Sequence, residues 1–368
     1  MTYFLKRTKP TKKGEYLQIY LSTYVPGKGS RNKCFRSLGY VSDLKEKGIE
    51  DPVREAEKEI EALNAQAREE PQIGEMSALK YAGHFLLKAM FDKLGLDSDI
   101  NTMTSNKKLG FKMSDFLRTM VYAFVISSGS KATDYEKVID NLYGCSSYTK
   151  EQIQEGIEVI GSDYPKYIEC LNHHIEKVWK RDSSTHYLGF SNACNGNSLL
   201  RIGLTADKDS IPIGMNIFVG KEIGKDQQKK LAEEIKTRFN IEGKILDVTE
   251  EETNDAKSIE EDFQWIKSGI GTADKEETVY SLFLIGYYAV TLLRLLESKV
   301  FKHELSLEEL VSFMQGYSLT ETKERNYVNS ATTSKALLII QNNISLSKLS
   351  NLYLKRKDVD GLFKTKIG

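Results

Sequence analysis

The chain has 368 residues, of which 40% are hydrophobic, so it is long enough for two or three domains with a sizeable core. The chain has 52 basic residues (lysine and arginine) and 52 acidic residues (aspartate and glutamate). Because the net charge is zero, it gives no support for a nucleic-acid partner. The N-terminus has no apolar signal segment and the four cysteines form no Cys-x-x-Cys pair, which predicts a cytoplasmic protein with reduced thiols.

Positive charge gathers at the N-terminus, where the first 39 residues contain nine basic residues and one acid, Glu15. Residues 16–25 alternate apolar and polar side chains, which is typical of a strand. The sequence PGKGS then turns the chain, and residues 31–41 return as a second strand. We therefore predict a basic β-ribbon over residues 1–41.

The nine cations of this ribbon are the candidate DNA-binding residues. Basic and aromatic residues interleave along both strands, which favours contact with phosphates over a merely solvated terminus. Arg31, Lys33 and Arg36 stand at i, i+2 and i+5, so in a regular strand they cannot all share one face. The full set is Lys6, Arg7, Lys9, Lys12, Lys13, Lys28, Arg31, Lys33 and Arg36.

A charged helix and a helical module are expected to follow the ribbon. Pro52 suits a first helical turn, and the charged, alanine-rich residues after it predict an exposed linker helix within residues 42–75. Residues 76–181 repeat apolar side chains at every third or fourth position, which predicts an all-helical module. Within it, Cys170 and His174 lie four residues apart and provide at most half of a metal site.

The pattern changes to mixed strand and helix in residues 182–300. Residues 199–220 contain two strand-like runs about a DKDS turn, and a helix and a short aliphatic strand, GKILDVT, follow. The uncharged run at residues 279–293 is shorter than the about 20 residues that cross a bilayer, so it is expected to be a buried helix. With a helical C-terminal region at residues 301–368, we predict an α+β fold that is largely helical.

The sequence KSIEEDFQWIKSG, residues 257–269, allows two interpretations. In the first, Ser258 caps an amphipathic helix whose first-turn acids, Glu260 and Asp262 among them, are solvated. In the second, Glu260 and Lys267 lie seven residues apart and almost in line on one face, as a metal-binding carboxylate and a phosphate-binding lysine would. The spacing alone does not choose between them.

The same helix carries a resemblance to a known family. It is similar to the Ile-Glu-x-x-Phe-x-x-x-Lys segment of DDE insertion-sequence transposases, in the subgroup with a Tyr-Arg-Glu-Lys signature, with Ile259, Glu260, Phe263 and Lys267 in register. The ribbon, the sequence DSIPIGMNIFVGKE and the sequence FLIGYYAVTLLRLLE also resemble this family, so the likeness covers nearly the full chain. It implies a DNA-transposition protein with a reduced RNase H-like core in residues 182–300.

The resemblance also implies a degenerate active site. The family's first catalytic aspartate corresponds to Gly189 in the sequence HYLGFSN, and glycine offers no metal ligand. The second corresponds to Glu250, whose extra methylene would displace an ion, while Glu260 and Lys267 match the motif unchanged. Asp207 lies in a predicted hairpin turn and is not expected to replace the lost carboxylate.

We therefore expect a transposase-like protein that binds double-stranded DNA, such as transposon-end-like DNA, and is catalytically defective. Whether it is a decayed transposase or a repurposed regulator stays open, and so does a homodimeric state. One alternative is a still-active DDE transposase that cleaves and transfers DNA strands with Mg²⁺ or Mn²⁺ held by Glu250 and Glu260. The other is a protein-interaction scaffold without DNA affinity. In the favoured case no cofactor and no membrane are expected, and the location is the cytoplasm, in association with a prokaryotic nucleoid.

Overall fold

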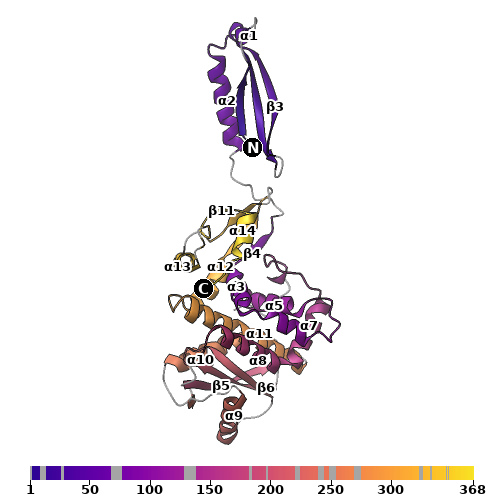
Figure 1. Cartoon of the computed structure of the whole chain (residues 1–368), viewed down its shortest axis with the longest axis vertical. Coiled ribbons are helices and arrows are strands. Elements are labelled where there is room, and N and C mark those ends of the chain that lie inside the picture. The colour runs from indigo at the N-terminus through magenta and orange to yellow at the C-terminus, as the bar shows by residue number, and fades with distance from the viewer. Residues whose placement is uncertain are drawn as a thin grey trace. The chain divides into compact units, whose positions relative to one another are not determined.

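The chain forms two compact units in the computed structural model, Met1–Gln72 and Ile73–Gly368. Helices predominate over strands, so the expected α+β class is confirmed at this level (Figure 1). The described residues are 2–8, 14–25, 29–67, 77–127, 138–181, 185–195, 198–219, 224–238, 244–247, 254–268, 275–322, 326–331, 334–344, 346 and 348–368.

The first unit is an antiparallel sheet covered by a helix. Its elements are β1 (Thr2–Arg7), β2 (Tyr16–Val25), β3 (Gly29–Tyr40), α1 (Val41–Glu46) and α2 (Pro52–Ala67). The strand order is β1-β2-β3, and Leu17 and Ile19 of β2 are buried, as are Ala56 and Ile60 of α2. A two-stranded ribbon is marginally stable in water, and β1 and α2 supply the missing burial. Much of α2 is exposed, as predicted, but its buried residues pack within this unit, so the helix belongs to the unit and is not a separate linker.

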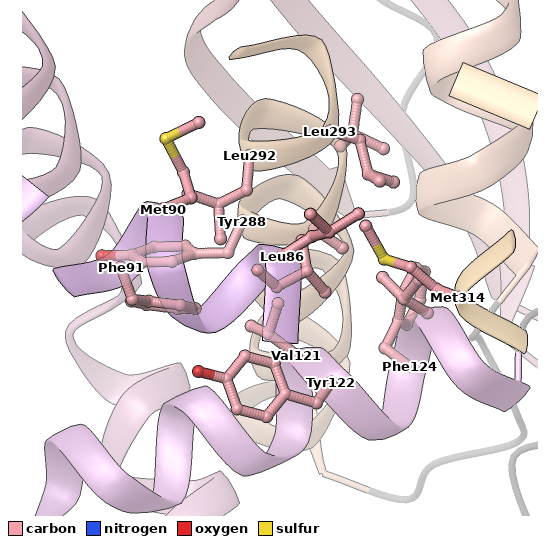
Figure 2. Close-up of a cluster of buried hydrophobic side chains, with 14 of the residues drawn as sticks. Leu86, Met90, Phe91, Val121, Tyr122, Phe124, Tyr288, Leu292, Leu293 and Met314 are labelled. Carbon is pink, nitrogen blue, oxygen red and sulfur yellow. The ribbon is translucent and has the colours of Figure 1, made fainter. Parts of the chain in front are cut away.

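The second unit contains most of the helices. They are α3 (Phe85–Leu94), α4 (Asp97–Met103), α5 (Met113–Ser127), α7 (Lys150–Ser162), α8 (Tyr164–Val178), α9 (Lys225–Arg238), α10 (Asn254–Ser268), α11 (Glu276–Leu295), the π-helical turn η2 (Leu296–Val300), α12 (Leu307–Gly316), α13 (Lys335–Ile344) and α14 (Arg356–Leu362). Helix α11 is apolar around its whole circumference, which is the pattern of a helix buried on all sides. Side chains of α3, α5 and α12 pack against it in the core (Figure 2). The residues labelled there are Leu86, Met90, Phe91, Val121, Tyr122, Phe124, Tyr288, Leu292, Leu293 and Met314.

Helix α11 with the turn that follows it is long and apolar enough to cross a membrane, but it lies in the hydrophobic core of the protein. Within the part of the chain that the structure describes, Glu276–Val300 is the one helix that passes this test, and 94% of its most apolar window is buried inside the protein. This burial is consistent with a soluble protein and confirms the predicted buried helix at residues 279–293.

The middle of the second unit's sequence forms a four-stranded sheet. Its strands are β5 (Thr185–Asn195), β6 (Ser198–Asp207), β7 (Pro212–Val219) and β8 (Lys244–Asp247). Their order is β7-β6-β5-β8, with β5, β6 and β7 antiparallel and β8 parallel to β5. Helix α9 covers one side, where Leu231 and Ile235 pack on Leu188, and α8, α10 and α11 lie on the other (Figure 1). The predicted hairpin, helix and short strand are all present.

A second sheet joins the beginning of this unit to its end. It contains β4 (Leu79–Tyr81), β9 (Ser318–Glu321), β10 (Asn326–Asn329) and β11 (Tyr353–Lys355), in the order β11-β10-β9-β4. The module predicted to be all-helical at residues 76–181 thus contains a strand, and the C-terminal region predicted to be helical contains three. Each of these strands is only three or four residues long, too short for alternation to be recognised in the sequence.

Candidate functional site

Strand β5 carries Gly189, the position at which the resemblance would place an aspartate, in the middle of its sheet. Gly189 pairs with Leu204 of β6, while on the other side of β5 Leu188 pairs in parallel with Asp247, the last residue of β8. Gly189 is buried. Because it has no side chain, it gives the site no ligand at this point of the sheet.

Helix α10 brings Lys267 to the same stretch of β5. The ammonium nitrogen of Lys267 donates a hydrogen bond to Ser191 Oγ at 2.9 Å and a longer one to the Asn192 carbonyl oxygen at 3.5 Å. Gly189 and Ser191 are two residues apart in a strand and therefore share a face. Lys267 thus binds the face of β5 to which an aspartate at position 189 would belong.

Of the other two predicted catalytic residues, the described one, Glu260, does not join this contact. Glu260 is exposed, and its position seven residues before Lys267 corresponds to about 10 Å along the helix axis. Glu250 lies outside the described residues. Of the two predicted residues that the structure describes, Lys267 is therefore the one placed against β5. Gly189 and an exposed Glu260 do not fit an ion held by two short carboxylates.

Helix α10 does not start where the sequence suggested. It begins at Asn254, so Ser258 lies inside the helix and cannot be its N-cap. Asp262, expected to be a solvated acid, is completely buried, and its Oδ1 accepts a 2.8 Å hydrogen bond from Arg294 Nε of α11. The interpretation as a capped helix with a solvated acidic face was therefore wrong, because a buried arginine on the neighbouring helix holds this acid inside.

Three carboxylates share the guanidinium of Arg294. Besides its bond to Asp262, Arg294 donates to Glu261 Oε2 and to Glu297 Oε2, each at 2.8 Å. Burial raises the pKa of Asp262 to about 7, against the opposing effect of Arg294. One guanidinium cannot compensate three carboxylates, and Asp262 Oδ2 has no hydrogen-bond partner among the described residues. These acids are committed to a structural cluster between α10 and α11.

Asp207 is likewise a structural acid. It is buried at the end of β6, and its Oδ1 accepts backbone hydrogen bonds from Asp209 at 3.0 Å and Ile211 at 2.9 Å, which hold the β6–β7 turn. Burial raises the pKa of Asp207, and the nearby Arg181, whose Nη1 lies 3.2 Å from Oδ2, acts in the opposite direction. Asp207 therefore stabilises the β6–β7 hairpin.

Asp247 is an acid that the sequence analysis passed over. It ends β8 and pairs with Leu188, the neighbour of Gly189, whereas the family register selected Glu250 three residues later. The available signal was the aliphatic strand KILD itself, which ends in an acid. The strand boundary could not be set by sequence to better than a few residues.

In the first unit, Arg31, Lys33 and Arg36 lie on one face of β3. They pair with alternate residues of β2, namely Thr23, Leu21 and Ile19. A β-bulge makes this possible, because Phe35 is an extra residue in β3 and shifts Arg36 onto the face of the other two. The prediction that the three cannot share a face was wrong, since it assumed a regular strand.

Other cations of the first unit have partners within it. Arg36 forms an ion pair with Glu59 of α2, and Arg7 binds Glu15 at 2.7 Å. The ammonium nitrogen of Lys6 lies 4.4 Å from the centre of a tyrosine ring. Both groups are on the face of the sheet opposite to that of the three β3 cations. The described cations therefore do not form a single surface, and they differ in how freely they could bind phosphate. The predicted DNA-binding residues outside the described ranges are Lys9, Lys12, Lys13 and Lys28.

A group that could hold a metal ion lies in the second unit. Asp99 of α4 joins Cys170 and His174 of α8, and their ligand atoms all lie within 4.8 Å of one another. The sequence showed only the cysteine and the histidine, because the aspartate is more than 70 residues away in the chain. The structure thus provides three possible ligands where the spacing indicated at most half a site.

A pocket of about 520 Å³ lies beside α3 and α5 and contains buried polar atoms without partners. Burial lowers the pKa of His84 to about 3, so its ring is neutral, and Nε2 donates to the Tyr143 carbonyl oxygen at 3.1 Å. His84 Nδ1 and the Tyr122 hydroxyl then have no hydrogen-bond partner among the described residues. Burial also raises the pKa of Cys145 to about 12, so this thiol is not a nucleophile at neutral pH.

No protein-family model, no curated protein and no solved structure matches this chain. Fold alone does not determine function, so the residues of the site and their contacts are the basis for a functional proposal.

Proposed function

We propose that the chain is a transposase-derived DNA-binding protein whose catalytic core is defective. The observation that supports it most is the hydrogen bond from Lys267 to Ser191 of β5, which is two residues after Gly189. Three antiparallel strands, a helix and a fourth strand parallel to the first also follow the topology of an RNase H-like core. Helix α10, which carries the family motif, comes next in the chain and packs on β5, as the resemblance implies.

The proposed inactivity is supported by the contacts that the groups near β5 make. Position 189 has no ligand, Lys267 donates a hydrogen bond to Ser191, and Asp262 accepts one from Arg294. A two-metal reaction needs carboxylates that converge on both ions within about 4 Å of each other. The buried acid of the described residues near β5 instead contributes to the packing of one helix on another.

The support for DNA binding is the cationic face of β3. Arg31, Lys33 and Arg36 share it, and β3 is an edge strand whose residues 31–37 are exposed. Cations on an exposed edge can contact phosphates, and such contacts release counterions. Arg36 is in an ion pair with Glu59, so Lys33 is the clearer test residue.

The DNA-binding proposal is tested by anisotropy of a labelled duplex between about 50 and 200 mM salt, where each phosphate contact contributes a slope of about 0.9 in log affinity against log salt. We expect Lys33→Ala to weaken binding and to lower this slope by about one. The matched control is Lys45→Ala, an exposed lysine in α1 of the same unit, which should change neither. Equal binding by the natural chain and Lys33→Ala would remove β3 from the proposal, and no binding by the natural chain would favour the scaffold alternative.

The inactivity proposal is tested with the same duplex and with transposon-end-like DNA in Mg²⁺ or Mn²⁺. We expect no strand cleavage by the natural chain and none by Glu260→Gln, with DNA binding unchanged in both. Cleavage by the natural chain that disappears in Glu260→Gln would establish the active-transposase alternative instead.

A further inference from the structure

The cluster of Asp99, Cys170 and His174 combines two neighbouring helices. Cys170 and His174 are four residues apart on α8, so their side chains lie on one face, one turn apart. Asp99 comes from α4, which packs against α8. All three ligand atoms are within 4.8 Å of one another, so a small adjustment would bring them to a common ion.

The imidazole of His174 is already oriented as in many metal sites. Its Nδ1 lies 2.7 Å from the Leu94 carbonyl oxygen, and only a protonated Nδ1 can donate to that acceptor. This bond leaves Nε2 facing Asp99 Oδ2 at 2.8 Å. A ligating histidine usually donates its other ring N–H to a backbone carbonyl or a carboxylate, which fixes its tautomer and orientation.

The exposure of the three residues provides a path for an ion. His174 is buried and Cys170 is half-buried, while Asp99 is exposed. An ion could therefore enter from the side of Asp99 and keep a water molecule as its fourth ligand. Three protein ligands with one open position are common for zinc.

The donor set also selects the kind of metal. A thiolate with an imidazole suits Zn²⁺ and related transition metals, whereas Mg²⁺ and Ca²⁺ prefer oxygen ligands. We propose that Asp99, Cys170 and His174 form a binding site for Zn²⁺, independent of the proposed function in DNA binding. On binding, the thiol of Cys170 releases its proton to solvent, as does the proton of the hydrogen bond between His174 Nε2 and Asp99 Oδ2, and both of these atoms then bind the metal.

The rival explanation is an ion pair without metal. Both nitrogens of His174 face acceptor oxygens, so a doubly protonated ring could join α8 to α4 by donating to Leu94 and Asp99. Such a pair does not involve Cys170. The participation of the thiol is therefore what distinguishes a metal site from the ion pair.

The experiment is a titration of the full chain, in a buffer without metal or thiol reagents, with Co²⁺ as a spectroscopic substitute for Zn²⁺. We expect one Co²⁺ per chain, with a thiolate-to-cobalt charge-transfer band and the d–d absorption of a tetrahedral ion, displaced by one equivalent of Zn²⁺. Cys170→Ser should abolish the charge-transfer band, and His174→Gln should weaken binding by at least about 10-fold.

Two control variants separate this site from other cysteines and histidines. Cys145→Ser removes a thiol in a different part of the unit, and His173→Gln removes the exposed histidine next to His174. Both should bind Co²⁺ like the natural chain. Absence of the charge-transfer band in the natural chain, or its persistence in Cys170→Ser, would overturn the zinc site and leave the ion pair as the explanation. Asp99→Asn tests the third ligand while leaving the thiol in place, because it should weaken Zn²⁺ binding but keep the charge-transfer band at saturating Co²⁺.

Discussion

The buried acid of α10 should make the stability of the second unit depend on pH. Asp262 is completely buried and its pKa is raised by burial from 3.8 to about 7. Between these two values the folded chain keeps a proton that the unfolded chain has lost. The folded state therefore binds more protons than the unfolded state, and stability decreases as pH rises through this window.

The size of the effect follows from the same two values. At about 1.36 kcal/mol per pH unit, a rise from 3.8 to about 7 corresponds to about 4 kcal/mol. This is an upper limit, since Arg294 attracts the ionised form and the cluster can relax. Asp262→Asn keeps the shape of the acid and cannot ionise. We therefore expect the natural chain to lose up to about 4 kcal/mol relative to Asp262→Asn between about pH 4 and pH 7.

The assay is urea unfolding of both proteins at intervals from pH 4 to pH 8, followed by far-ultraviolet circular dichroism. Comparing the two proteins at each pH cancels the titration of groups that they share. Glu260→Gln is the matched control, because it neutralises an exposed acid of the same helix and should run parallel to the natural chain. Parallel curves for the natural chain and Asp262→Asn would refute the reasoning, since Asp262 would then be ionised throughout as the partner of Arg294.

Two further predictions concern packing and hydrogen bonding in the core. Gly161→Ala should destabilise the chain by at least about 1–3 kcal/mol in urea unfolding, because its Cβ would lie 1.8 Å from the Glu277 carbonyl oxygen; Gly110→Ala, whose nearest neighbour would be at 3.6 Å, is the control, and an equal loss in both would contradict the clash. Tyr288→Phe should cost about 0.5–1.5 kcal/mol, because its hydroxyl donates to a buried carbonyl oxygen at 2.7 Å. Tyr122→Phe should cost nothing or stabilise, since that hydroxyl has no partner among the described residues, and thermal melting that ranks the two tyrosines in the opposite order would contradict this.

The sequence could predict those elements whose pattern is local. Alternation identified the strands at residues 16–25 and 199–220, and the uncharged run identified the buried helix at residues 279–293. These features depend on neighbours within one element.

The rest depended on partners that are distant in the chain. Asp262 is buried because Arg294 lies on the next helix, and a carboxylate is otherwise expected in solvent. The cations of β3 share a face because Phe35 forms a bulge, which alternation cannot reveal. Asp99 reaches His174 only through the packing of α4 on α8. In each case the tertiary contact, and not the local pattern, determined the outcome.

The consecutive acids of α10 point in different directions and therefore make different contacts. Successive residues of an α-helix point about 100° apart, so Glu260, Glu261 and Asp262 cannot serve one site. Glu260 is exposed, whereas Glu261 and Asp262 bind Arg294 on α11. Lys267 faces β5, where its ammonium group donates a hydrogen bond to Ser191 Oγ. The contacts of this helix therefore support the fold, and stability rather than DNA cleavage is the property that should respond to changes in its acids.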